Sequence, residues 1–300
     1  MDVQGLGYIA IETPKPANWT TFLVNVVGLM EEDTPAGCDP DAKYFRLDER
    51  SYRISVKESP SESYVIGWEL ASPAAFDRAV AELVEAGVAV KQAQHSQAVL
   101  RGVGGLAKLD DPFGNPIELY WGQLSSETPF DSPQQMSGFV AGDSGIGHVF
   151  YVVPSCAKAL EFYCGVLGFK PTDYYPLGTN SAWFVRSNSR HHTAAFVDSE
   201  LPGGPGLSHF MLEANRLEDV GRALDRATDA GTEIVMSLGQ HSNDKTVSFY
   251  MRSPGRTNIE LGVDQLRCND DTWQVVAWAT GNDLWGHRGP FMEEMTAGQS

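Results

Sequence analysis

The chain has 300 residues, of which 42% are hydrophobic and 20% charged, a composition typical of a globular protein large enough for two domains. Its formal net charge is -17, from 22 basic and 39 acidic side chains, and the sequence has no run of lysine and arginine. Such a chain would be repelled by nucleic acids and by acidic membrane surfaces, so both classes of partner are excluded.

The cysteines and the N-terminal segment indicate where the protein resides. The 4 cysteines have neither CxxC spacing nor the density of a disulfide-rich protein, which favours reduced thiols. The first residues lack the basic and apolar regions of a signal peptide, and no apolar run approaches the ~18 residues of a membrane span. We therefore expect a cytoplasmic protein without a membrane anchor.

Apolar spacing of three and four residues predicts short helices, each followed by a glycine suited to the left-handed conformation at a helix end. These glycines are Gly28, Gly87, Gly168 and Gly231. Runs rich in β-branched and aromatic residues predict strands at 8–11, 53–56, 148–153, 194–197 and 246–251. A unit of one helix among several strands cannot bury its open sheet alone, so we expect α+β domains in which paired units form a curved, barrel-like sheet.

The second half of the sequence repeats the first. The segment Gly5–Tyr8 precedes Gly145–His148 by 140 residues, and Glu118 precedes Glu260 by 142. Apolar periodicity lapses between the halves at 124–144. The predicted organisation is an N-terminal domain without metal, a C-terminal catalytic domain and a tail that packs on it, at residues 1–133, 134–282 and 283–300.

Histidine is concentrated in the second half, where six of the 7 histidines lie at or beyond residue 148. His148, His209 and Glu260 each lie in an apolar, strand-like run. A carboxylate with apolar neighbours must be paired or bind a metal. Two imidazoles and one carboxylate can occupy one face of an octahedral Fe(II) and leave three positions open. Zinc with the same ligands is an alternative that would activate water instead.

Several segments together resemble the type I extradiol ring-cleaving dioxygenases, and most closely the two-domain dihydroxybiphenyl and dihydroxynaphthalene dioxygenases. The likeness covers nearly the whole chain, including segments of the first half and of the tail. The segments that carry it are 145–148, 190–193, 209–213, 241–244, 248–250 and 254–260, with 111–114 and 285–287.

The resemblance implies the vicinal oxygen chelate fold, with four βαβββ units in two domains, and one Fe(II) per chain in the C-terminal domain. Manganese is the less favoured metal. His148, His209 and Glu260 would be the ligands. His192 occupies the place of the family's acid/base histidine, whose reference pKa of about 6.5 suits proton transfer near neutrality. His241 and Tyr250 occupy the places of groups that hydrogen-bond the substrate oxygens.

The resemblance also indicates the substrate. Phe150 and Phe184 fall at pocket-lining positions, which fits a second aromatic ring and equally fits core packing. Asn243 and Asp244 are either turn residues or pocket residues, and His191 and His287 are expected to be structural. We predict extradiol cleavage of a bicyclic or biaryl catechol by dioxygen, in the degradation of aromatic compounds, by a homo-oligomer.

Two other functions are compatible with this fold. One is a glyoxalase-like isomerase or a metal-dependent transferase, and the other is a metal-free binding protein. Tyr8 stands where the second half has His148, and the segment 67–70, expected to correspond to the second ligand, has no histidine. The first half is therefore expected to hold no metal, which argues against an enzyme whose ligands come from both halves.

Overall fold

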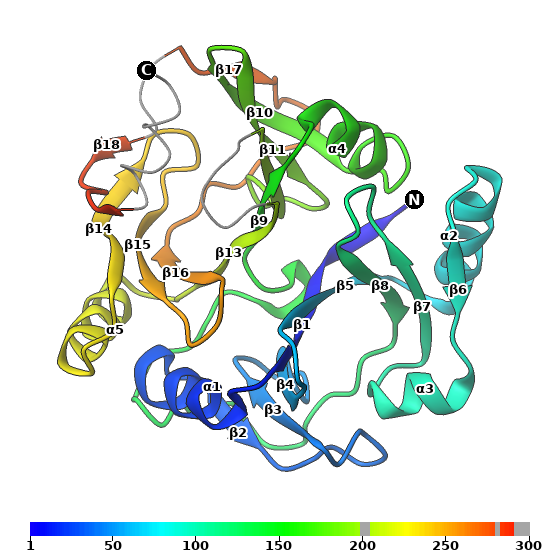
Figure 1. The fold of residues 1–300 in the computed structure, drawn as a ribbon, viewed down its shortest axis with the longest axis horizontal. Coiled ribbons are helices and arrows are strands. Elements are labelled where there is room, and N and C mark those ends of the chain that lie inside the picture. Colours follow the sequence, from blue (N-terminus) through cyan, green and yellow to red (C-terminus); the bar gives the residue numbers. More distant parts are fainter. Residues whose placement is uncertain (199–204, 280–282, 291–300) are drawn as a thin grey trace.

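Two sheets of eight and ten strands, side by side, form the framework of the protein (Figure 1). The computed structural model describes residues 1–198, 205–279 and 283–290. The first sheet comes from the first half of the chain and the second from the second half, and the helices lie on the periphery (Figure 1). Among the described residues, no helix combines the length and the apolar character needed to cross a bilayer.

Each sheet contains two units of one strand, one helix and three further strands. The first unit consists of β1 (Val3–Thr13), α1 (Pro16–Phe22), β2 (Met30–Glu32), β3 (Ala42–Arg46) and β4 (Ile54–Glu58). The second consists of β5 (Ser63–Leu70), α2 (Pro73–Glu85), β6 (Val90–Gln92), β7 (Gly105–Asp110) and β8 (Pro116–Trp121), with α3 (His95–Leu100) inserted between β6 and β7.

The second half repeats this arrangement. Its first unit consists of β9 (Val149–Val153), α4 (Cys156–Tyr163), β10 (Lys170–Leu177), β11 (Asn180–Arg186) and β12 (Ala194–Asp198). Its second consists of β13 (Gly206–Glu213), α5 (Leu217–Asp229), β14 (Ile234–His241), β15 (Val247–Arg252) and β16 (Asn258–Val263). Outside these units lie the short helix η2 (Gly142–Ser144) and the edge strands β17 (Val276–Ala277) and β18 (Asp283–Trp285).

The strand order shows how the two units of each half form one continuous sheet. In the first sheet the order is β2-β3-β4-β1-β5-β8-β7-β6, so the opening strands of the two units pair at the centre. The second sheet has the equivalent order around β9 and β13, with β17 and β18 added at its edges. Pairing the units removes two exposed sheet edges. The predicted α+β fold of paired βαβββ units is confirmed.

Most predicted helix ends are confirmed. After α1 the chain continues as the π-helix η1 (Leu23–Val27), which ends at Gly28 in the left-handed conformation, at φ 93°. The Ser72 hydroxyl caps α2 by accepting a hydrogen bond from the Ala75 amide at 3.2 Å. The helix predicted to end at Gly168 is α4, which ends earlier, at Tyr163. Helix α3 is not among the helices predicted from the sequence, because its six residues are too few to give a periodic pattern.

The two halves share one apolar core. The indole of Trp68 packs edge-on against Phe169, with ring centroids 5.0 Å apart. The Ile146 amide donates to the Leu6 carbonyl at 2.8 Å, which ties the start of the second half to β1. In the tail, β18 pairs with β14, so the predicted packing of this segment on the second half is confirmed for the described residues 283–290.

Gly147 marks a close approach of backbone segments beside the second sheet. A Cβ atom at this position would overlap the carbonyl oxygen of Met211, which is part of β13 and cannot rotate away. We expect Gly147→Ala to lower the free energy of unfolding by about 1–3 kcal/mol, the usual cost of overpacking. The control is Gly221→Ala within α5, where a Cβ meets nothing within 4 Å, and stability should rise slightly. Urea denaturation of both variants measures the difference, and equal stabilities would contradict the prediction.

Candidate metal and catalytic site

Three adjacent strands bring His148, His209 and Glu260 together. His148 immediately precedes β9, whose neighbour β13 carries His209, and β13 pairs in parallel with β16, which carries Glu260. His148 Nε2 lies 3.1 Å from Glu260 Oε2 and 3.3 Å from His209 Nε2, and His209 Nε2 lies 3.5 Å from Glu260 Oε2. The three predicted ligands therefore converge on one point.

The donor atoms have the spacing that a metal requires. Ligand atoms about 2.1 Å from one metal, on one face of an octahedron, are about 3 Å apart, which the three measured distances approach. His148 and His209 are 2% and 3% exposed, and Glu260 is fully buried. A buried group of two imidazoles and one carboxylate, with its donor atoms facing one another, fits a divalent metal.

Burial and hydrogen bonds set the charges of this group. Burial alone would raise the pKa of the Glu260 carboxyl, but hydrogen bonds from His148, His209 and His241 outweigh it and hold this pKa well below its usual range. Burial also lowers the pKa of His209 to about 4, although Glu260 opposes the shift. At neutral pH the site thus offers an ionised carboxylate beside a neutral His209 imidazole, both able to bind a metal.

His192 lies directly beside the predicted ligand His148. Its ring centroid is 4.0 Å from that of His148. Burial is the main reason that the pKa of His192 lies well below its usual value, and the neighbouring His148 and His191 lower it further. A neutral imidazole at this position can accept a proton.

His241 and Tyr250 form a second polar pair next to Glu260. Tyr250 lies opposite Glu260 in the register of β15 and β16. His241 Nε2 lies 2.9 Å from the Tyr250 hydroxyl and 3.6 Å from Glu260 Oε1. Burial opposes protonation of His241, but its hydrogen bonds to Asp283 and Glu260 prevail and raise its pKa to about 10. Burial raises the pKa of Tyr250 well above its usual value, so its hydroxyl keeps its proton.

Aromatic side chains border His209 and His192 on one side. Phe150 stacks on His209 with centroids 4.9 Å apart and an interplanar angle of 14°. Phe184 meets His192 edge-on, also at 4.9 Å. Both belong to an apolar cluster that includes Tyr175. The two residues predicted to line the pocket therefore contact site histidines and are part of a buried apolar cluster.

The remaining candidates divide into turn, tail and site positions. The Asp244 carboxylate accepts hydrogen bonds from the Thr246 amide at 3.0 Å and its hydroxyl at 2.6 Å, which is a turn arrangement. Asn243 is buried and its Nδ2 has no hydrogen-bond partner within the described residues.

His287 Nδ1 lies 2.6 Å from Asp283 Oδ1, which is also 3.1 Å from His241 Nδ1. Asp283 is a site neighbour that sequence reasoning missed, because only the β14–β18 pairing brings it near.

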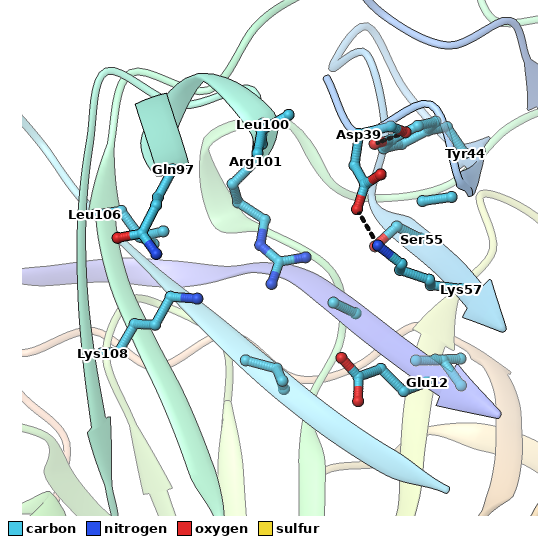
Figure 2. Close-up of a pocket in the computed structure, with 14 residues that line it drawn as sticks. Glu12, Asp39, Tyr44, Ser55, Lys57, Gln97, Leu100, Arg101, Leu106 and Lys108 are labelled. Carbon is cyan, nitrogen blue, oxygen red and sulfur yellow. Dashed lines mark hydrogen bonds and ion pairs between the residues drawn. The ribbon is translucent and has the colours of Figure 1, made fainter. Parts of the chain in front are cut away.

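The first half has a different arrangement at the equivalent positions. Tyr8 donates a hydrogen bond to Glu118 at 2.5 Å, and Arg101 Nε lies 2.8 Å from the same oxygen. Lys108 Nζ lies 3.5 Å from the other Glu118 oxygen. In Figure 2 the Arg101 and Lys108 side chains point into a cavity of about 220 Å³, which Val65 also lines. Two cations and a phenol compensate this carboxylate, as a metal would.

The position equivalent to His209 is Val65, so the expectation for 67–70 is wrong in its placement. Val65 pairs with Ala10 as His209 pairs with Phe150. The two halves are offset by 140 residues up to the ends of β4 and β12, by 143 at the start of β5 and β13, and by 144 from Val65 and His209 onwards. Three of the four additional residues fall between β12 and β13, and the fourth is at the register shift between Leu207 and His209. The conclusion that the first half lacks this imidazole still holds.

Comparisons with known proteins agree with this fold and site. Residues 145–261 match the Glyoxalase/Bleomycin resistance protein/Dioxygenase superfamily, and residues 6–58 match the family described as dihydroxybiphenyl dioxygenase BphC D1. The chain is 39% identical over 295 residues to a biphenyl-2,3-diol 1,2-dioxygenase of Paraburkholderia xenovorans (strain LB400), covering 96% of both proteins. It is 33% identical to an iron-dependent extradiol dioxygenase of Rhodococcus jostii (strain RHA1), covering 96% of this chain and 97% of that protein.

A solved structure is equally similar. The crystal structure described as BphC, a halotolerant catechol dioxygenase, superposes with a TM-score of 0.89 at 31% identity and covers 97% of this chain and 96% of that one. Fold and site thus define a metal-dependent enzyme of the vicinal oxygen chelate class. The chain belongs to the extradiol dioxygenase family, whose members are ring-cleaving oxidoreductases that act on small molecules with dioxygen.

The two carboxylates provide a matched test of the metal site. We expect Glu260→Gln to lose bound metal, because it removes the anionic ligand, whereas Glu118→Gln in the first half should keep it. Metal analysis of each purified variant, alongside the unchanged protein, which we expect to hold one metal per chain, measures the outcome. Metal loss from the Glu118 variant while the Glu260 variant keeps its metal would contradict the assignment, and circular dichroism shows whether both are folded.

Proposed function

We propose that this enzyme opens the ring of a bicyclic or biaryl catechol beside the diol, at an Fe(II) held by His148, His209 and Glu260. Both atoms of dioxygen enter the product, so the reaction needs no external reductant. The observation that carries the proposal is the buried convergence of these three side chains, directly beside His192 and the pair of His241 and Tyr250.

A ferrous ion bound at this site would supply the Lewis acidity that binds the catechol oxygens and the electrons that make dioxygen reactive. The protein contributes an environment that excludes water, since all three ligands are buried. Three ligands on one face leave the opposite face for the substrates. A rival isomerase or transferase of this fold gives no role to His192, His241 and Tyr250 together.

His192 is the proposed acid and base. Burial keeps its imidazole neutral, so it can take a proton from the catechol and return it as the O–O bond breaks. Its Nδ1 lies 3.1 Å from His191 Nδ1, which leaves Nε2 as the nitrogen for this transfer.

His241 and Tyr250 are proposed to hydrogen-bond the substrate oxygens. Tyr250 keeps its hydroxyl proton and His241 carries a charge, so both can donate. Their separation of 2.9 Å lets the two groups hold one oxygen atom together. Asn243, whose buried Nδ2 has no hydrogen-bond partner among the described residues, is proposed as a further substrate contact. Asp244 is proposed to hold the turn that carries Asn243.

The aromatic cluster supports a substrate with a second ring. Phe150 and Phe184 extend from the site histidines into an apolar group with Tyr175, where a distal ring would be shielded from water. The biphenyl-2,3-diol 1,2-dioxygenase at 39% identity supports the same choice. A monocyclic catechol would leave this apolar wall unused.

Iron is preferred to manganese because the relative from Rhodococcus jostii is described as iron-dependent. The donor atoms alone accept either metal. A homo-oligomer, a cytoplasmic location and the domain limits 1–133, 134–282 and 283–300 remain predictions. Light scattering during size-exclusion chromatography measures the first of these.

The reaction and its substrate class are tested together. Protein reconstituted anaerobically with Fe(II) should consume oxygen and form a ring-opened product when 2,3-dihydroxybiphenyl is added in air. Phe150→Ala should raise KM for this substrate about tenfold, the effect of losing roughly one aromatic contact, and should affect unsubstituted catechol much less. If no catechol causes oxygen uptake, the proposed reaction is wrong. If Phe150→Ala changes KM equally for 2,3-dihydroxybiphenyl and for catechol, the proposed substrate class is wrong. Reconstitution with Mn(II) in parallel decides the metal.

The role of His192 is tested by His192→Gln. This change removes proton transfer but no metal ligand, so kcat should fall about 10²–10⁴-fold while the iron content is unchanged. Substrate binding, followed by the absorbance of the anaerobic complex, should persist. Unchanged turnover would show that another group carries the proton.

A further inference from the structure

A buried carboxylate and a second histidine lie behind His192. Asp173 in β10 and His191 are both fully buried. His191 Nε2 lies 3.1 Å from Asp173 Oδ2, the oxygen that also accepts a hydrogen bond from Trp278 Nε1 at 2.7 Å. His191 and His192 do not point to opposite faces, because the chain between β11 and β12 is not extended, and their Nδ1 atoms lie 3.1 Å apart.

The positions of the ring protons follow from the carboxylate at the end of this chain. The contact between His191 Nε2 and Asp173 Oδ2 is an electrostatic one that lacks hydrogen-bond geometry, and the negative charge of the carboxylate favours a proton on Nε2, the nitrogen that faces it. A neutral His191 then presents a lone pair at Nδ1, and the proton between the two rings belongs to His192 Nδ1. Asp244 Oδ2 lies 3.9 Å from the same His192 nitrogen, and its negative charge also favours a proton there.

We propose that Asp173 and His191 are positioning residues that hold His192 as the Nδ1–H tautomer, with Nε2 free to accept a proton. This inference rests on the proposed function only in giving His192 the role of proton carrier. Asp173 contacts His191, His191 contacts His192, and the ring of His192 lies 4.0 Å from that of His148, so both residues act through His192.

The packing fixes the rings as well as the protons. His191 meets Trp273 edge-on at 5.5 Å and His192 edge-on at 5.4 Å, with interplanar angles of 86° in both cases. Its amide donates to the Leu266 carbonyl at 2.9 Å. These contacts hold the ring with Nε2 toward Asp173 and Nδ1 toward His192.

The tautomer can be measured without catalysis. In metal-free protein labelled with ¹⁵N-histidine, the two ring nitrogens of His192 should give one protonated Nδ1 and one bare Nε2 signal. The 7 histidines of the chain make the spectrum tractable, and His192→Gln identifies the signals that belong to His192. A proton on Nε2 in the unchanged protein overturns the proposal, whether or not the enzyme cleaves a catechol.

Two substitutions of His191 separate positioning from packing. His191→Asn keeps an acceptor near the Nδ1 position, whereas His191→Leu has similar bulk and no acceptor. We expect the Leu variant to populate both tautomers of His192 and to lose about ten- to a hundredfold in kcat, part of the general acid–base contribution, with KM and iron content unchanged. The Asn variant should recover most of kcat.

Asp173→Leu should produce the same change in the His192 signals as His191→Leu, because His191 is then free to adopt either tautomer. Equal kcat in the two His191 variants, together with an unchanged His192 spectrum, overturns the proposal. If a Leu variant does not fold, the spectra of the unchanged protein and of His191→Asn still decide the question.

Discussion

The buried charge of Glu260 is the constraint on which the rest of the site depends. This carboxylate is fully buried, and a buried charge must be compensated. Nitrogen atoms of His148, His209 and His241 lie 3.1, 3.5 and 3.6 Å from it. These side chains come from four different parts of the second sheet. The site can therefore form only when the strands of that sheet pair in the observed register. A shift of one residue in any of these strands would turn a site residue to the opposite face.

The first half meets the same requirement in another way. Glu118 is compensated by Arg101, by Lys108 and by the Tyr8 hydroxyl, which together replace a removable metal by permanently attached groups. Tyr8 stands in the place of His148 and Val65 in the place of His209, so neither imidazole is present there. The duplicated architecture thus compensates a buried carboxylate in two ways, with histidine side chains that could share a metal in the second half and with attached cations and a phenol in the first.

The sequence was sufficient for the fold and for the meeting of His148, His209 and Glu260, because helix ends and strand runs are local signals and the unequal repeat singles out these three residues. It was insufficient wherever distant segments determine the outcome. Three residues added between β12 and β13, and a register shift within β13, change the offset of the repeat, so Val65 could not be identified by counting. Asp173 and Asp283 approach the site histidines only through strand pairing and side-chain packing. His191 was expected to be structural because an extended chain was assumed around it.

The shared core also constrains how the protein can change over generations. Trp68 packs on Phe169, and the Tyr163 hydroxyl reaches Asp111 at 3.3 Å, so each half completes the interior of the other. A deletion that removed the half without imidazoles would leave apolar surface of the catalytic half open to water. Substitutions at the residues of the first half that pack against the second half are therefore expected to destabilise both halves.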